Sequence, residues 1–532
     1  MFGAWSFAAP FDGPADEVQH SIRAAGVASF DLGQIFAKPI VVPDAFGRPG
    51  IGAAQRVPVG MDAHATCFGN NPQVSADCAK GLHGGPMGEV TTAAGRYNPI
   101  YYMVVGPPLR LWTNWGGLVV ARLINSALTA ALLAWAMVCL LRWSRFGLMA
   151  AGLLGAATPM LAHLAGAVNP NAAEIAAGIV LFSAGIPLLL SPPSDQKRML
   201  IHAVGVSSVI LLTLRAAGPG WLFFGLLALL VPMRRQWLRE WWRMRVVKLW
   251  IGGIALAAVL SLAWIIGMGT VALVKPAPGT WNYTPSNATV MYLNSWYTYL
   301  RGMVGVAGWF DTNMWAPFYI IWIVLVASLV VFACMVGNWA LRWRFVAFFL
   351  GVVVFPGYMQ VSQVNMTGFI TNGRYMLPLA VGMPLLAAYV LERQLLTQHH
   401  VRSLNRMFVV LLVPIQMVFL VFAMVRWQRG IGNGPGVGWL NPLKGNWHPP
   451  TGSVPPLLLM LAGVLLTGWL FWRAQGLALA YPNRPAELDV PTTKAETPKQ
   501  PDGEPPASEL VATIDAEPAA AEPQPEPAPS RR

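Results

Sequence analysis

The stretch GLVVARLINSALTAALLAWAMVCLL at residues 117–141 decides the fold class of this chain. It is longer than the ~20 apolar residues that an α-helix needs to cross the ~30 Å hydrocarbon core of a bilayer. A second stretch of this kind, WAPFYIIWIVLVASLVVFACMVG, occupies residues 315–337. Two such segments predict a membrane protein whose spans are α-helices, because a helix satisfies its backbone hydrogen bonds internally.

The composition of the whole chain supports this prediction. Of the 532 residues, 55% are hydrophobic and 11% are charged, whereas roughly a quarter of the residues in soluble domains are charged. Many of the 23 Trp and 12 Tyr residues stand at the ends of apolar stretches, where aromatic side chains anchor helices at the membrane interface. We predict an all-α polytopic protein with about eleven transmembrane helices, near residues 117–141, 146–167, 172–191, 199–216, 219–232, 249–274, 315–337, 345–361, 375–392, 405–427 and 454–474.

The distribution of charge predicts how these helices are oriented. The net charge of +13 does not indicate nucleic-acid binding, because the basic residues are concentrated in short loops. Fifteen Lys and Arg residues lie in one set of alternate loops and five in the other set; the first set is 142–145, 192–198, 233–248, 338–344 and 393–406. The positive-inside rule places this first set on the cytoplasmic side of the membrane and the other loops on the exoplasmic side.

The chain therefore divides into membrane and exoplasmic regions with a cytoplasmic tail. Residues 1–11 resemble the last turns of a first membrane helix whose earlier part would precede Met1, which would raise the count to about twelve. Within the loop that follows, residues 38–95 are rich in Gly, Pro and Asn and are expected to be irregular. The predicted regions are a remnant of the first helix at 1–11, an exoplasmic loop with interfacial helices at 12–116, membrane helices at 117–274, an exoplasmic amphipathic segment at 275–314, membrane helices with an exoplasmic loop 428–453 at 315–475, and a disordered cytoplasmic tail at 476–532.

The four cysteines fall into two groups. Cys139 and Cys334 lie inside apolar stretches, where thiols are usually inert. Cys67 and Cys78 lie in the polar loop 12–116, and an oxidising compartment there favours a disulfide between them. The alternative is a pair of free thiols.

Three polar clusters are candidates for a functional site. Polar groups at the rim of a membrane are energetically costly, so their presence there indicates a role. The first contains Asp16, Glu17 and His20. A carboxylate there can act as a general base, and Asp16 and Glu17 together could hold a divalent metal ion. The alternative is a helix cap with solvated neighbours.

The second cluster, Asn169, Asn171 and Glu174, stands at the exoplasmic start of a predicted membrane helix. Such a helix N-terminus can bind an anion. The alternative is a helix that begins at a proline and is capped by asparagine.

The third cluster surrounds Arg374 in the stretch TNGRYMLP, where Gly373 leaves room for close approach. A guanidinium group there suits a phosphate, although the side chain could instead reach toward lipid headgroups. We expect Asp16, Glu17 and Arg374 to converge on one exoplasmic pocket, with Arg374 too far from the carboxylates for a tight salt bridge.

Several motifs, taken in order, resemble a bacterial family of predicted multi-pass membrane proteins known as a domain of unknown function. They are DGPADEVQH, NPIYYMVVGPPLRL, HLAGAVNPNAAEIA, GWFDTNMWAPFY and NGRYMLPL, within roughly residues 5–430. That family in turn is similar to the GT-C glycosyltransferases, which have many membrane helices, a long first exoplasmic loop and a lipid-linked sugar donor.

The resemblance implies particular site residues. Asp16, Glu17 and His20 match the family's Asp-Glu-x-x-His, and Arg374 and Tyr375 match its Gly-Arg-Tyr. Asn169 and Asn171 match its Asn-Pro-Asp, although Asn171 replaces the expected aspartate. This departure leaves open whether Glu174 compensates or whether the site is altered.

The resemblance implies a GT-C-type glycosyltransferase that moves a sugar from a polyprenyl-phosphate donor to an extracytoplasmic acceptor of the cell envelope. The expected partners are membrane lipids, this donor and a glycan or lipid acceptor, without nucleic acid. The alternatives are a transporter or flippase for a lipid-linked glycan and a non-catalytic protein of envelope assembly. A transporter would show polar residues within the spans and internal repeats, whereas the polar residues here gather at the rim.

Overall fold

Helices make up most of the computed structural model, which describes residues 1–43, 49–274, 280–431 and 440–481. Within these residues, nine helical segments are long and apolar enough to cross a membrane. They are α6 (Trp115–Trp143), α9 (Asn171–Leu189), α10 (Arg198–Leu214) with the turn before it, α13 (Arg245–Gly267), α16 (Ala316–Val336), α17–α18 (Trp339–Thr367), α19–α20 (Gly373–Gln394), α21 (Gln398–Arg429) and α22 (Val454–Trp472). The prediction of an all-α polytopic membrane protein is confirmed.

The other two predicted spans are shorter or broken. The stretch 219–232 forms α11 (Gly218–Leu230), which is apolar but too short to reach across a full bilayer core. The stretch 146–167 forms two short helices, α7 (Met149–Ala156) and α8 (Pro159–Ala165). The break falls at Thr158, which is extended because the residue before a proline is disfavoured in the helical conformation.

Two of the long helical segments are also interrupted. A π-helical turn at Leu350–Val354 joins α17 (Trp339–Phe349) to α18 (Phe355–Thr367), just before Pro356, which cannot donate a backbone hydrogen bond. The residue Val381 separates α19 (Gly373–Ala380) from α20 (Gly382–Gln394). The remaining helices are α1 (Phe2–Ala8), α2 (Glu17–Val27), α3 (Leu32–Ile35), α4 (Pro99–Val105), α5 (Pro107–Leu111), α12 (Arg235–Arg243), α14 (Pro285–Asn294), α15 (Trp296–Val304) and α23 (Ala474–Leu479).

The segment 38–95 is not irregular, as expected from its composition, but contains a small sheet. Strands β1 (Ile40–Pro43), β2 (Pro49–Pro58) and β3 (Met87–Thr92) pair antiparallel in the order β1-β2-β3. In β2 and β3, Val57 and Val90 are buried in a core shared with Val18 and Ile22 of α2. The strands β4 (Val306–Ala307) and β5 (Thr312–Asn313) form a second, two-stranded sheet. Tertiary packing against α2 therefore stabilises a sheet that its Gly- and Pro-rich sequence hides.

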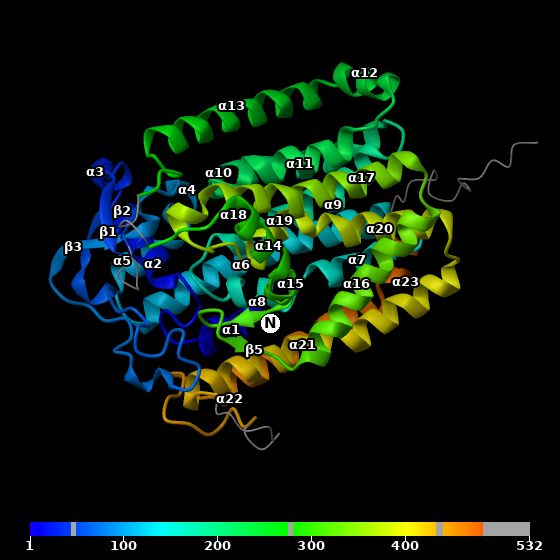
Figure 1. Ribbon diagram of the computed structural model, residues 1–532. Helices are drawn as coiled ribbons and strands as arrows, with labels where there is room; N and C mark the ends of the chain where they lie inside the picture. The colour runs from blue at the N-terminus through cyan, green and yellow to red at the C-terminus, as the bar shows by residue number, and fades with distance from the viewer. Residues whose placement is uncertain (44–48, 275–279, 432–439, 482–532) are drawn as a thin grey trace, which may run out of the picture. The chain divides into compact units, whose positions relative to one another are not determined.

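Burial separates the central helices from those at the periphery. In the apolar stretch of α9, 94% of the residues are buried, and in that of α19–α20 the share is 89%. The corresponding shares of buried residues in α13 and α22 are 11% and 17%. Figure 1 shows α13 and α22 on opposite outer sides of the helices they flank. At the centre, Gly178 of α9 allows the carbonyl of Pro378 in α19 to approach, since a Cβ atom there would lie 2.1 Å from it. The outer helices can then present their exposed apolar side chains to lipid.

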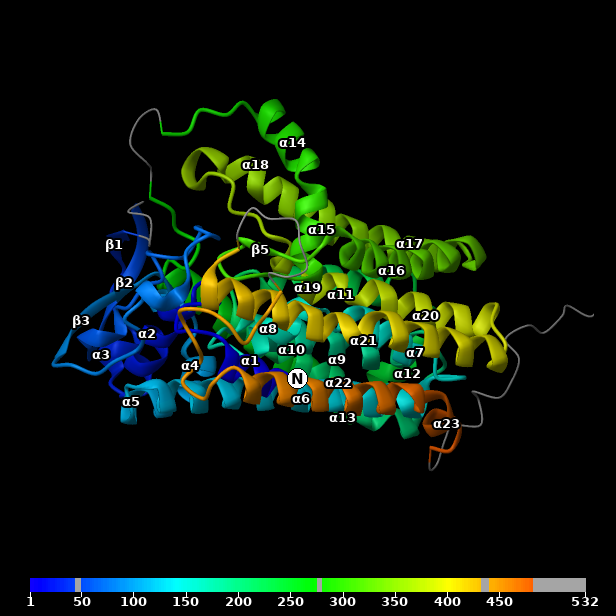
Figure 2. The same cartoon turned by 90° about the horizontal axis from the view of Figure 1, so that it is seen from below.

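The membrane helices have two different ends. The three-stranded sheet and helices α2, α4 and α5 gather at one end, whereas α12 and α23 lie at the other end in both views (Figures 1 and 2). Part of the predicted exoplasmic loop 428–453 and nearly all of the predicted tail 476–532 lie outside the described residues. The end that carries the sheet also carries the polar site described next.

Candidate active site

A polar pocket of about 110 Å³ opens where the start of α2, the end of α10 and the start of α19 meet. Five of the eight side chains predicted for the site line it, so the structure brings distant parts of the chain together. The lining residues are Asp16, Gln19, His20, Ala93, Ala94, Tyr97, Asn169, Arg215, Arg374 and Tyr375.

Asp16 stands at the N-cap position of α2 but does not cap it. Its backbone is left-handed, with φ of 71°, and its side chain accepts no hydrogen bond from the helix backbone. Aspartate tolerates this conformation better than most residues, and here its carboxylate accepts a charged hydrogen bond from Nη2 of Arg374. Burial alone would raise the pKa of Asp16, but the charge and the hydrogen bond of Arg374, with smaller contributions from His20 and Arg215, outweigh burial and hold that pKa below its usual value. Asp16 is therefore an ionised carboxylate at neutral pH.

Arg374 is fixed by the local structure at the start of α19. Asn372 caps this helix by accepting the N–H of Arg374 at 3.1 Å. The guanidinium group lies over the ring of Phe310, 4.6 Å from its centroid, and Nη2 lies 3.2 Å from the hydroxyl of Tyr375. The expectation that Arg374 would be too far from Asp16 for a tight salt bridge is wrong, since the two side chains pair directly.

Gly373 allows another helix of the protein to approach closely. The space above its backbone is therefore filled by the protein and is not, as the sequence had suggested, open to another molecule. A Cβ atom at this position would lie 1.9 Å from the carbonyl oxygen of Tyr299 in α15. The absence of a side chain thus lets α15 pack tightly on the start of α19, which holds the backbone that carries Arg374.

The sequence did not identify Arg215, a second cation in the pocket. It follows the last residue of α10, and its guanidinium lies 4.7 Å from the ring centroid of Tyr375. Its Nη1 lies 3.7 Å from Oε2 of Glu174, which also accepts a hydrogen bond from Nδ2 of Asn171 at 3.0 Å. Glu174 therefore pairs with Arg215 outside the pocket, and Asn171 holds Glu174 in place; neither residue lines the pocket. The signal in the sequence was an arginine directly after an apolar span, at the same membrane end as Arg374.

His20 presents a neutral imidazole to the pocket. Its Nδ1 lies 2.8 Å from the hydroxyl of Tyr102. Burial lowers the pKa of His20 to about 3, even though the charge of Asp16 acts in the opposite direction. At neutral pH, His20 can therefore accept or donate a hydrogen bond but carries no charge.

Glu17, although next to Asp16 in sequence, lies outside the pocket. Its carboxylate forms a fully buried pair with Arg122 of α6, with an Oε1–Nε distance of 2.8 Å. Arg122 also donates to the backbone carbonyls of Ser6, Ala9 and Pro10. These contacts tie the segment between α1 and α2 to a membrane helix, so Glu17 occupies a structural position in the described chain.

The carboxylate oxygens of Asp16 and Glu17 are not arranged to bind one divalent metal ion. Asp16 is engaged by Arg374 and Glu17 by Arg122, so the two carboxylates face different partners. Within the described residues, no group of three or more His, Cys, Asp or Glu side chains is placed to hold a metal.

Cys67 and Cys78 form a disulfide in the structure, with a Cα–Cα distance of 6.2 Å. Arg426 of α21 holds the loop between them by donating to the carbonyls of Phe68 and Asn71. Arg426 also pairs with Asp311 at 2.7 Å. The disulfide loop is thereby attached to a membrane helix.

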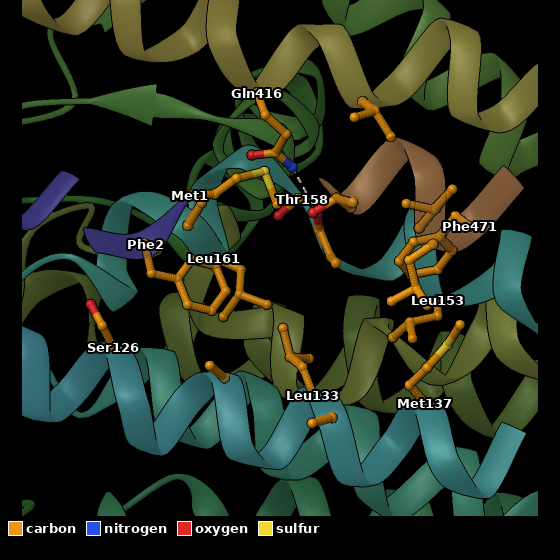
Figure 3. Close-up of a pocket in the computed structure, with 18 of the residues that line it drawn as sticks. Met1, Phe2, Ser126, Leu133, Met137, Leu153, Thr158, Leu161, Gln416 and Phe471 are labelled. Atoms are coloured by element: carbon orange, nitrogen blue, oxygen red, sulfur yellow. Dashed lines mark hydrogen bonds between the residues drawn. The ribbon is translucent and has the colours of Figure 1, made fainter. Parts of the chain in front are cut away.

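A much larger cavity, of about 590 Å³, lies among the membrane helices (Figure 3). It is lined by residues of α1, α6, α7, α8, α16, α21 and α22, with apolar side chains such as Leu133, Leu153 and Phe471. Gln416 lies at its side and donates to the carbonyl of Ala157 at 3.0 Å. None of the described residues that line it is Asp, Glu, Lys or Arg, and none of them lines the polar pocket. The cavity is therefore suited to an apolar chain.

Comparisons with known proteins place the chain in a family. No curated protein matches its sequence. Two crystal structures of ArnT from Cupriavidus metallidurans, one bound to undecaprenyl phosphate and one in the apo state, are similar to it with 12% identity and a TM-score of 0.39. Each similarity covers 90% of this chain, and 75% and 74% of the respective ArnT chains. A family model described as "Predicted membrane protein (DUF2142)" matches residues 1–383, so this chain belongs to that family, as its ordered motifs predicted.

Proposed function

We propose that this membrane protein is a GT-C-type glycosyltransferase that moves a sugar from a polyprenyl-phosphate donor to a cell-envelope acceptor on the exoplasmic side. The observation that carries the proposal is the polar pocket at one end of the membrane helices. There the carboxylate of Asp16 pairs with the guanidinium group of Arg374, and the guanidinium group of Arg215 lines the same pocket. Sugar transfer from a phosphate needs both kinds of group, a base for the acceptor and positive charge for the leaving group.

The two arginines would bind the phosphate of the donor. Arginine suits this role because its planar guanidinium donates two parallel hydrogen bonds to phosphate oxygens. Without substrate, the charge of Arg374 is taken up by Asp16. A donor phosphate would compete for Arg374 and release the carboxylate of Asp16 toward the acceptor. The Asp16–Arg374 pair would thus couple donor binding to activation of the base.

In the proposed reaction, Asp16 accepts the proton of an acceptor hydroxyl as the acceptor oxygen bonds to the anomeric carbon of the sugar. The bond between that carbon and the phosphate oxygen breaks, and polyprenyl phosphate leaves with the electron pair. Arg374 and Arg215 stabilise the negative charge of this leaving group. Neutral His20, held by Tyr102, would orient the acceptor or the sugar by a hydrogen bond.

The apolar cavity offers a place for the prenyl chain of the donor. Leu123 lines this cavity and is the neighbour of Arg122, which binds Glu17 beside Asp16. A volume of about 590 Å³ whose described lining has no acidic or basic side chain would accept hydrocarbon. The cationic pocket and the apolar cavity together supply the two environments that a lipid phosphate needs.

The test uses the full-length protein in liposomes that contain a polyprenyl-phosphate-linked hexose and a crude envelope acceptor fraction. We expect release of polyprenyl phosphate with sugar incorporation, and a loss of turnover of about 100-fold or more in Asp16→Asn, as is typical when a general base is removed. Asp31→Asn is the matched control, because Asp31 is an exposed carboxylate that caps α3 away from the pocket.

Two outcomes would overturn the proposal. If Asp16→Asn and Asp31→Asn were equally active, Asp16 would not be the base. If the lipid-linked hexose crossed the bilayer without release of polyprenyl phosphate, the protein would be a transporter of lipid-linked sugars.

A further inference from the structure

A strongly basic surface lies at the end of the molecule opposite the polar pocket. Helix α12 connects α11 to α13 there, far from the sheet in both views (Figures 1 and 2). Between residues 234 and 248 there are six basic side chains and one acidic side chain, Glu240, and all seven are exposed. The basic ones are Arg234, Arg235, Arg239, Arg243, Arg245 and Lys248.

These charges are available to an external partner. Among the described residues, none of the six forms an ion pair, and Glu240 does not neutralise a neighbour. The guanidinium group of Arg234 lies over the ring of Trp237, 5.6 Å from its centroid. The surface therefore attracts anions, and the polar pocket and its chemistry do not use it.

Apolar side chains on the same helix identify the kind of anion. In α12 the arginines 235, 239 and 243 recur every four residues and share one face. Trp237 and the buried Trp241 lie on the opposite face, whereas Leu238 and Trp242, which are 44% and 57% exposed, flank the arginines on the exposed side of the helix. A soluble acidic partner or a free phosphate would leave these exposed side chains in water. A lipid surface provides headgroups for the arginines and hydrocarbon for Leu238 and Trp242.

We infer that α12 and the first turn of α13 form a docking surface for anionic phospholipid headgroups. The arginines at 235, 239 and 243 contact lipid phosphates, and Leu238 and Trp242 enter the boundary between headgroups and acyl chains. Because α13, which follows α12 directly, is itself long and apolar enough to cross a membrane, this surface lies at the depth where headgroups are found. The inference does not depend on the proposed sugar transfer.

The test measures which lipids stay bound to the full-length protein. The protein is reconstituted into phosphatidylcholine vesicles with or without phosphatidylglycerol, extracted gently, and analysed by native mass spectrometry. We expect the wild-type protein to retain phosphatidylglycerol in preference to phosphatidylcholine, and high salt during extraction to weaken this preference. The triple variant R235Q/R239Q/R243Q is expected to lose it.

A second triple variant, R342Q/R406Q/R473Q, is the matched control. It removes the same charge from exposed arginines outside α12 and α13, so it should keep the preference for phosphatidylglycerol. Equal unfolding temperatures in pure phosphatidylcholine would show that both variants fold. The inference is overturned if the wild-type protein shows no preference, or if both triple variants lose it to the same extent.

Discussion

Asp16 and Glu17 are neighbours in the sequence, but their carboxylates serve different parts of the molecule. Asp16 has left-handed backbone geometry and Glu17 is the first residue of α2, so their side chains leave the chain in different directions. One meets Arg374 in a partly exposed pocket, and the other is buried against Arg122. A difference of one residue thus separates a candidate base from a structural ion pair.

The buried pair predicts a large loss of stability when one partner is removed. In Glu17→Gln, the guanidinium of Arg122 would remain buried without a counter-charge, which costs about 3–5 kcal/mol in comparable sites. Denaturant titration in mixed micelles should show this decrease in the free energy of unfolding. The double variant Glu17→Gln/Arg122→Met should lose less than the single variant, because no uncompensated charge remains. A single variant as stable as the wild type would contradict the buried-pair assignment.

His20 predicts a dependence of stability on pH. Its pKa falls from the usual 6.5 to about 3 in the folded protein because of burial. Below pH 6.5 the unfolded chain takes up a proton that the folded chain does not, so stability decreases as the pH falls from 6.5 toward 3. Between pH 7 and pH 5 this amounts to about 2 kcal/mol. His20→Gln should lack this part of the decrease, and the exposed His399→Gln should retain it.

Measurement of the unfolding free energy at several pH values checks this prediction. If the wild type and His20→Gln lose stability in parallel, then His20 is charged in the folded state. It would then not be the neutral hydrogen-bonding group assigned to the pocket.

At the scale of the elements, the loop between Cys67 and Cys78 is held in two ways. The disulfide closes the loop, and Arg426 of α21 binds its carbonyl groups and Asp311. The first constraint acts mainly on the unfolded chain. The second acts on the folded chain and links the loop to β5, which follows Asp311.

Non-reducing peptide mapping should therefore yield one cross-linked peptide pair, containing Cys67 and Cys78. Cys67→Ser/Cys78→Ser should lower the free energy of unfolding by about 3 kcal/mol, the expectation for a short closed loop. Cys334→Ser, which changes an unbridged thiol, is the control and should have a small effect. Alkylation of both Cys67 and Cys78 without prior reduction would contradict the disulfide.

How far these elements could be predicted depends on whether their signals are local. The spans of α6 and α16 follow from hydropathy alone, because a long apolar stretch has few alternatives. The three-stranded sheet could not be predicted from hydropathy. Its strands β2 and β3 are stabilised by packing on α2 and show no clear alternation of apolar and polar residues. Arg215 falls at the end of the predicted span 199–216 and was not recognised as a site residue. Its place in the pocket depends on the end of α10 meeting the start of α19, which no local pattern reveals. The convergence of Asp16 and Arg374 was expected from chemistry, but not their direct pairing.

At the scale of the whole molecule, the two ends of the helices differ in chemistry. The end with the sheet carries the disulfide loop and the polar pocket, and the other end carries the basic helix α12. A disulfide persists in oxidising compartments, and basic loops remain in the cytoplasm. Two independent physical arguments therefore favour the same orientation, with the pocket outside the cell.

Cysteine accessibility in intact cells tests this orientation. In a background with Cys139 and Cys334 replaced by serine, single cysteines are placed at exposed positions of the two ends, Glu89→Cys in β3 and Gln236→Cys in α12. A membrane-impermeant maleimide should label Glu89→Cys in intact cells and Gln236→Cys only after permeabilisation. The reverse pattern would place the pocket in the cytoplasm. Asp16 and Arg374 would then face nucleotide-linked sugars and not an exoplasmic acceptor, and the proposed reaction would fail on topology whatever the activity of the isolated protein.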